Sequence, residues 1–308
     1  MNRWWIYQRE RFPVLAHSPL IAAFSLSAVC YSALLRGPAA RPLALGALVA
    51  FGTSFCSFFQ LRIADEFKDA EEDRQFRPYR PVPRGLIKLR ELAWVGSGLA
   101  VAQLALCLWL ATRGGVWRWP LAALLLVTWG YFALMSREFF APEWLKARPV
   151  VYLFSHMFIM PLVDWYATGC DWVPAGGPMP RGLFWFLAAS FSNGIVLEIG
   201  RKIRAPEQEE PGVRTYTALW GRPVAVGSWL AALAATLACA LGAAQRIGFL
   251  PVAGGVLGAL LLGAVILGVG FLRTVRGGLA RGIEAYSGGW TLALYLLLGV
   301  VPLAVRLL

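Results

Sequence analysis

Apolar stretches of about 20 residues recur along the whole chain and constrain its fold more than any other feature. A helix needs about 20 apolar residues to cross a hydrocarbon core about 30 Å thick. Hydrophobic residues make up 58% of the sequence, a value typical of membrane proteins. The sequence therefore predicts an all-α membrane protein, with nine transmembrane helices in a single bundle formed by residues 1–308. The stretches are roughly residues 14–35, 42–61, 89–112, 117–136, 149–168, 182–199, 222–243, 247–271 and 286–306.

The basic residues between these stretches are distributed unevenly. In alternate loops, 22 of the 29 Lys and Arg residues fall on the side of the N-terminus, and 7 fall on the opposite side. Because Lys and Arg concentrate in cytoplasmic loops, we expect a cytoplasmic N-terminus, an external C-terminus and a multi-pass protein, such as one of a bacterial inner membrane. Topology and attraction to the anionic lipid bilayer then explain the net charge of +12 without nucleic acid.

The most charged stretch, residues 62–85, follows the second apolar stretch and reads RIADEFKDAEEDRQFRPYRPVPRG. Asp65, Asp69 and Asp73 are spaced four residues apart, so a continuous helix would carry all three on one face. Carboxylates held together need a cation, and oxygen-rich clusters bind Mg²⁺, usually with substrate phosphates. We expect Asp65, Asp69 and Asp73 to bind Mg²⁺ or Mn²⁺; the alternative is a solvated loop neutralised by its arginines.

A second charged stretch follows the sixth apolar stretch, at residues 192–212. Asn193 and Glu198 lie within or at the end of this span, where polar side chains should face the bundle interior. Because the two charged stretches lie four helices apart, we expect a four-helix internal duplication. A single cavity between them could hold metal ions that bridge to phosphates.

Ionisable residues inside a membrane span are costly and are candidates for function. His156 lies deep in the fifth span, and its alternative role is a hydrogen bond to a neighbouring helix. We expect Asp164 near the outer interface. The five cysteines lie singly in or beside apolar spans and form neither a disulfide framework nor a metal-ligand spacing.

The first charged stretch resembles the signature of the UbiA superfamily of intramembrane prenyltransferases, which is Asn-Asp-x-x-Asp-x-x-x-Asp followed by Arg-x-x-x-Arg-Pro-x-Pro-x-Gly. Here it reads Asp65-Glu66-x-x-Asp69-x-x-x-Asp73, then Arg77-x-x-Arg80-Pro81-x-Pro83-x-Gly85. Gly212-x-x-Thr215-x-x-x-x-x-Gly221 is similar to the run that follows the second aspartate motif of the family. Tyr131 with Arg137, and Lys146-Ala147-Arg148-Pro149, look like its helix-four tyrosine and basic loop.

The sequence departs from this signature at three points. Asp65 stands where the family has asparagine, the spacing to the arginine-proline segment is two residues shorter, and the second Asp-x-x-x-Asp motif is absent. Only Glu198, Glu207, Glu209 and Glu210 can replace that motif. We expect Glu198 and then Glu207 to bind the second metal.

The resemblance implies transfer of an isoprenyl group from a polyprenyl diphosphate to an aromatic or other lipophilic acceptor, such as a quinone or pigment precursor. It implies Mg²⁺, or Mn²⁺, and an active site between the cytoplasmic loops 62–90 and 198–221. A terpene cyclase of the same superfamily and, less expected, a noncatalytic transporter or scaffold remain as alternatives. The implied catalytic carboxylates are Asp65, Asp69, Asp73 and Glu198. The implied substrate-binding residues are Arg77, Arg80, Tyr131, Arg137, Lys146, Arg148, Asn193 and Lys202.

Overall fold

The computed structural model describes residues 2–308 and confirms the predicted helical membrane fold. Within these residues, nine spans are long and apolar enough to cross a membrane. Each coincides with one of the predicted apolar stretches, and most extend it by a few residues. Seven spans are single helices: α2 (Val14–Arg36), α3 (Ala44–Lys68), α5 (Leu89–Ala111), α6 (Trp119–Ser136), α10 (Leu183–Arg201), α12 (Arg222–Arg246) and α13 (Leu250–Arg273).

The remaining two spans are broken, each at a position that the sequence explains. The fifth consists of α8 (Pro149–Met157) and α9 (Ile159–Trp172). Pro161 cannot donate a hydrogen bond to the carbonyl of Met157, so the helix is interrupted there. The last consists of α14 (Gly277–Leu298) and α15 (Val300–Leu307), and the break at Gly299 packs so closely on Ser27 of α2 that a side chain would collide with its backbone.

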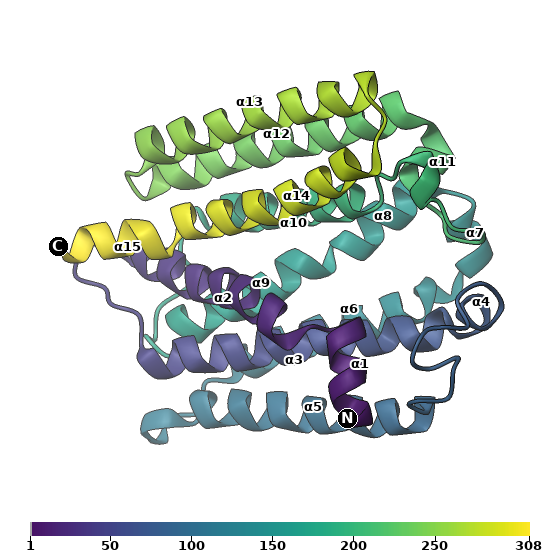
Figure 1. The fold of residues 1–308 in the computed structure, drawn as a ribbon. Coiled ribbons are helices and arrows are strands. Elements are labelled where there is room, and N and C mark those ends of the chain that lie inside the picture. The colour runs from purple at the N-terminus through teal and green to yellow at the C-terminus, as the bar shows by residue number, and fades with distance from the viewer. Residues whose placement is uncertain (1) are drawn as a thin grey trace.

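Short helices connect the spans. In Figure 1, α4, α7 and α11 gather at the right-hand end of the bundle, which is the end that we predict to be cytoplasmic. The C-terminus and α15 lie at the opposite end. The α-helices among these connections are α1 (Arg3–Arg11), α4 (Ala70–Phe76), α7 (Pro142–Lys146) and α11 (Tyr216–Trp220), and the 3₁₀ turns are η1 (Arg113–Gly115), η2 (Glu138–Phe140) and η3 (Pro206–Gln208).

Two groups of helices place the two charged stretches opposite each other. α3 packs against α2, α5 and α9, whereas α10 packs against α9, α12 and α14. α10 and α14 approach closely because Gly200 faces Ser287, leaving no room for a side chain at that position. The ends of α3 and α10 therefore lie on two sides of one space, which is closed by α8 and by the loop that leads into α11.

Candidate active site

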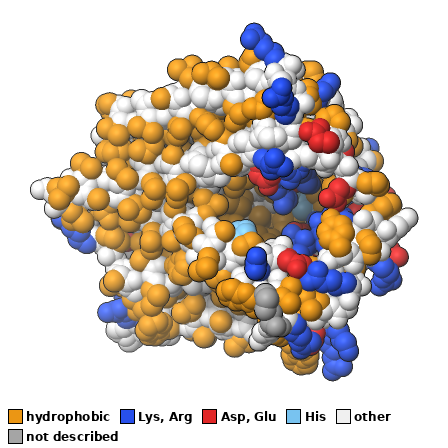
Figure 2. Space-filling model, viewed as in Figure 1, with side chains coloured by type: hydrophobic (Ala, Val, Ile, Leu, Met, Phe, Trp, Pro, Cys, Tyr) orange, Lys and Arg blue, Asp and Glu red, His pale blue; other side chains and the backbone are white. Residues whose placement is uncertain are grey.

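A cavity of about 790 Å³ lies between these two helix ends. Figure 2 shows the molecule hollowed between α14 and α1, with charged side chains on the right of the hollow and hydrophobic side chains on its left. A ligand with an anionic head and an apolar tail would fit this change from charged to hydrophobic side chains. Apolar side chains that line the cavity include Leu20, Ile21, Phe24, Phe58, Leu61, Met157, Ile159 and Met160.

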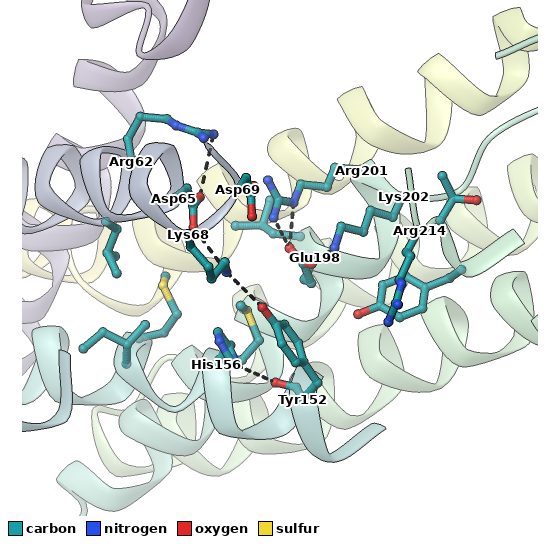
Figure 3. A pocket seen from close by; sticks show the side chains of 18 of the residues that line it. Arg62, Asp65, Lys68, Asp69, Tyr152, His156, Glu198, Arg201, Lys202 and Arg214 are labelled. Carbon is teal, nitrogen blue, oxygen red and sulfur yellow. Dashed lines mark hydrogen bonds and ion pairs between the residues drawn. The ribbon is translucent and has the colours of Figure 1, made fainter. Parts of the chain in front are cut away.

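Asp65 and Asp69, which we call the aspartate wall, line the cavity from the end of α3 (Figure 3). The carboxylate of Asp65 lies 3.5 Å from Lys68 Nζ and 3.7 Å from Arg62 Nη1, beyond ordinary hydrogen-bond distance. Asp69 has no ion-pair partner within 4.0 Å among the described residues. Burial raises the pKa of Asp69 above its usual value, and the charge of Lys68 partly opposes this effect. Both carboxylates keep oxygens free for a ligand.

Asp73 does not share this wall, contrary to the expectation of a single face. α3 ends at Lys68, and Asp69 has φ −90° and ψ 4°, so α4 starts in a new direction. The Asp73 side chain is 2% exposed and accepts from Arg80 at 2.7 Å and pairs with Arg77 at 2.8 Å. Asp73 thus holds α4 to the loop behind the cavity, whereas Arg77 and Arg80 themselves line it.

Glu198, Arg201 and Lys202, which we call the cationic wall, lie across the cavity at the end of α10 (Figure 3). Arg201 Nε donates to one carboxylate oxygen of Glu198 at 2.6 Å, and Lys202 Nζ pairs with the other at 2.7 Å. The cations also stabilise the C-terminus of the helix through its dipole. Arg201 was not predicted as a site residue, although its position three residues after Glu198 signals the pairing.

A chain of polar contacts joins the aspartate wall to α8. Lys68 Nζ donates to the hydroxyl of Tyr152 at 2.9 Å, and this hydroxyl donates to Glu138 at 3.3 Å. The ring of Tyr152 stacks on His156, with 3.9 Å between centroids. Lys68, Tyr152 and Glu138 were not predicted as site residues, because their meeting depends on how α3 approaches α8. In the sequence, these residues are distinguished only as polar residues in or beside an apolar span.

Glu138 reaches the cavity through a backbone turn that L-residues rarely adopt. Glu138, Phe139 and Phe140 have φ values of 48°, 52° and 58°, which lie in the left-handed region. Such residues cost about 1–3 kcal/mol each and persist where the surroundings hold them. The bond from Tyr152 supplies one such constraint.

The ring nitrogens of His156 have different partners. Nδ1 lies 2.9 Å from the carbonyl oxygen of Tyr152, which can only accept, so Nδ1 carries the proton. Nε2 is buried and has no hydrogen-bond partner among the described residues, and His156 lines the cavity. The neutral ring therefore holds a buried, unpaired proton acceptor beside the cavity.

Several other residues named from the sequence lie away from the cavity lining. Asn193 is buried in the bundle and accepts from Thr291, and Tyr131 donates to the carbonyl of Ser155 at 2.6 Å. Arg137 is exposed, and Arg148 stacks on Trp144. Lys146 does line the cavity. Asp164, which we predict to lie near the outer interface, is fully buried among the helices and accepts from the Tyr295 hydroxyl at 3.2 Å.

The loop glutamates after Pro206 hold the backbone in place. Glu207 accepts from the backbone N–H of Gly277 at 2.6 Å, and Glu209 accepts from the hydroxyls of Thr215 and Thr217. Thr215 also caps α11, and Gly212 has φ 74° and packs against the ring of Phe76 with no room for a side chain. The glycine and threonine of this motif therefore shape the loop over the cavity.

The cavity suits Mg²⁺ at one position. Among residues 2–308, no three His, Cys, Asp or Glu side chains are close enough to form a metal site by themselves. Mg²⁺ in phosphate-transfer and related sites is commonly bound by one or two carboxylates with substrate phosphates and water. Asp65 and Asp69, one helical turn apart with free oxygens, fit that requirement. Glu198 does not, because both of its oxygens are paired with cations.

Comparisons with known proteins agree with this geometry. A model of the UbiA prenyltransferase family matches residues 25–281. The apo structure of a UbiA homologue from Aeropyrum pernix K1 has a TM-score of 0.65 at 15% identity, covering 95% of this chain and 98% of that chain. A structure of digeranylgeranylglyceryl phosphate synthase has a TM-score of 0.60 at 14% identity, covering 99% of this chain and 100% of that one. No curated protein matches the chain in a sequence comparison.

Proposed function

This chain belongs to the UbiA prenyltransferase family and is a multi-pass membrane prenyltransferase, and from that premise we propose how its cavity is used. It transfers an isoprenyl group from a polyprenyl diphosphate to an aromatic or other lipophilic acceptor, such as a quinone or pigment precursor. The reaction requires Mg²⁺ and occurs at the cytoplasmic end of the bundle. One observation carries this proposal: free carboxylates and a surplus of cations face each other beside the apolar side chains that line the cavity, which we call the apolar floor.

The charges around the cavity favour a polyanionic ligand. Nine Lys and Arg residues and six Asp and Glu residues line it in the described part of the chain. A surplus of cations repels a metal ion that arrives alone but attracts a diphosphate. When bound on Asp65 and Asp69, Mg²⁺ would neutralise charge that develops on the leaving diphosphate.

The side chains of the protein contribute to each stage of the reaction. The allylic carbon–oxygen bond breaks, and its electron pair leaves with the diphosphate, where Arg77, Arg80 and Lys202 stabilise the growing negative charge. The apolar floor holds the isoprenyl tail and keeps water from the carbocation. The aromatic rings of Phe24 and Phe58 can stabilise that cation from the cavity wall.

His156 completes the transfer by removing a proton. After the acceptor forms a bond to the allylic carbon, it must lose a proton, and His156, which lines the cavity, carries a buried Nε2 without a hydrogen-bond partner among the described residues. The Nδ1–H bond to the Tyr152 carbonyl fixes the tautomer in which Nε2 is unprotonated and can accept a proton. We therefore propose His156 as the general base.

The test uses purified protein in lipid nanodiscs with isotopically labelled farnesyl and geranylgeranyl diphosphates and a panel of phenolic and hydroxyl acceptors. We expect diphosphate release that depends on Mg²⁺, together with a product whose mass is that of the acceptor plus the isoprenyl group. Diphosphate release with only cyclic hydrocarbon products would contradict transfer and support cyclisation. Absence of diphosphate release with every substrate would contradict both reactions.

A further inference from the structure

The two walls of the cavity differ in how their carboxylates are paired. Asp65 and Asp69 keep free oxygens, whereas both oxygens of Glu198 are held by cations at 2.6 Å and 2.7 Å. With one negative and two positive charges, the cationic wall carries a local charge of +1. A divalent ion at Glu198 would have to displace a side chain or enter a positive site, and Coulomb repulsion opposes the second course.

The sequence spacing leads to the same conclusion. Glu198 and Lys202 are four residues apart, which is the separation of the two carboxylates in the Asp-x-x-x-Asp motif that this chain lacks. A cation thus stands where a second carboxylate would complete a metal site. The loop glutamates cannot replace it, because none of the three lines the cavity. Glu207 accepts from the backbone of Gly277, Glu209 from the hydroxyls of Thr215 and Thr217, and Glu210 from the hydroxyl of Tyr79.

The two cations remain accessible to a ligand while they hold Glu198. The side chain of Arg201 is 52% exposed and that of Lys202 is 33% exposed, whereas that of Glu198 is only 9% exposed. A diphosphate between the walls would therefore meet these cations on the side opposite Asp65 and Asp69.

On the premise of the prenyl transfer above, we propose that this enzyme binds its diphosphate with a single divalent ion. The aspartate wall holds that ion, and Arg201 and Lys202 bind diphosphate oxygens directly in place of a second ion. Guanidinium donors match phosphate oxygens in pairs, and the ammonium supplies a compact charge. Glu198 is a positioning residue that aligns the two cations.

The experiment counts metal ions without requiring turnover. Purified protein is saturated with the S-thiolo analogue of farnesyl diphosphate, which does not ionise, and bound Mn²⁺ is measured by equilibrium dialysis. Electron paramagnetic resonance then reports whether two Mn²⁺ ions are coupled. We expect one Mn²⁺ per protein and no coupling. Two coupled ions would overturn the proposal.

Substitutions at Lys202 test the role of the lysine. Lys202→Asp places a second carboxylate one turn after Glu198, so we expect it to bind two coupled Mn²⁺ ions. Arg214→Asp is a matched control, because it makes the same charge change at a cavity-lining residue outside α10, and Arg214 donates to the backbone carbonyl of Lys146, so the change frees no carboxylate. This control should bind one Mn²⁺.

Lys202→Gln removes the cation without adding a ligand and keeps the proposal testable if the aspartate variant fails to fold. We expect one bound Mn²⁺ and analogue binding weakened about 10–100-fold. Unchanged analogue binding in Lys202→Gln would overturn the role of Lys202. If the wild-type protein binds no analogue even with Mn²⁺, the proposed prenyl transfer itself is contradicted. Analogue binding with two coupled ions would contradict only the single-ion proposal.

Discussion

The aspartate wall and the cationic wall both begin with an acidic residue at the end of a membrane helix that borders the cavity, yet their surroundings differ. Asp65 and Asp69 face cations at 3.5 Å or more, whereas Glu198 is bound on both oxygens by its own helix terminus. Net charge along the sequence does not distinguish these cases. What a carboxylate can bind depends on whether its neighbours have already taken its oxygens, and here only one wall is left free for a metal ion.

Of all the changes that we predict, removal of the metal ion should have the largest effect on prenyl-transfer activity. In excess chelator, after metal has been stripped from the protein, we expect prenyl transfer to disappear because the aspartate wall cannot bind diphosphate without an ion. Mg²⁺ or Mn²⁺, hard cations suited to oxygen ligands, should restore it. Product formation is followed by mass spectrometry. Full activity of the stripped protein would show that neither wall uses a metal.

Asp69→Asn and Glu198→Gln compare the walls directly. Loss of a metal ligand that stabilises the leaving group should lower kcat/KM by about 10²–10³-fold in Asp69→Asn. Glu198→Gln leaves Arg201 and Lys202 in place, so we expect a loss of about tenfold or less, through their poorer alignment. The measurement is kcat/KM for the diphosphate at saturating Mg²⁺. Equal losses in the two variants would abolish the distinction between the walls.

Asp73→Asn should reduce stability, because Asp73 holds Arg77 and Arg80 in a buried cluster. Removing one partner of a buried ion pair costs about 3 kcal/mol. We expect the melting temperature in detergent to fall by several degrees, while activity per folded molecule decreases much less than in Asp69→Asn. A stable Asp73→Asn variant without activity would place Asp73 with the metal ligands after all.

His156→Gln tests a residue that belongs to neither wall. The amide cannot accept a proton from the acceptor, so we expect the rate of prenylated product formation to fall about 10²-fold. Binding of the non-ionising S-thiolo analogue of farnesyl diphosphate should be unchanged, which separates a lost base from a distorted site. A loss of analogue binding as large as the loss of rate would exclude His156 as the base.

The sequence predicted the spans and the two charged ends, because apolar length and charge are local properties. It also predicted that Asp65 and Asp69 share a surface, since they lie one turn apart. It could not predict that Asp73 turns away, because this depends on the end of α3 at Lys68 and on Arg80 binding back across the loop. Tyr152 and Glu138 were missed for a similar reason, as α8 and η2 reach the cavity only in the folded bundle. The four-helix duplication and the orientation in the membrane stay predictions.

The smallest expected effect is at Lys146 and Arg148, which the sequence predicts to bind substrate. Lys146 lines the cavity and lies 3.5 Å from Glu72, whereas Arg148 stacks on Trp144 outside it. Both are exposed to solvent, so their charges are screened and each contributes little. We expect Lys146→Ala to raise KM for the diphosphate about two- to threefold, with kcat unchanged, and this increase should shrink at high salt. Arg148→Ala should leave KM unchanged, since its guanidinium is directed to the indole ring. An equal rise in KM for both variants would mean that diphosphate attraction reflects the total charge of the loop and not the position of each cation at the cavity.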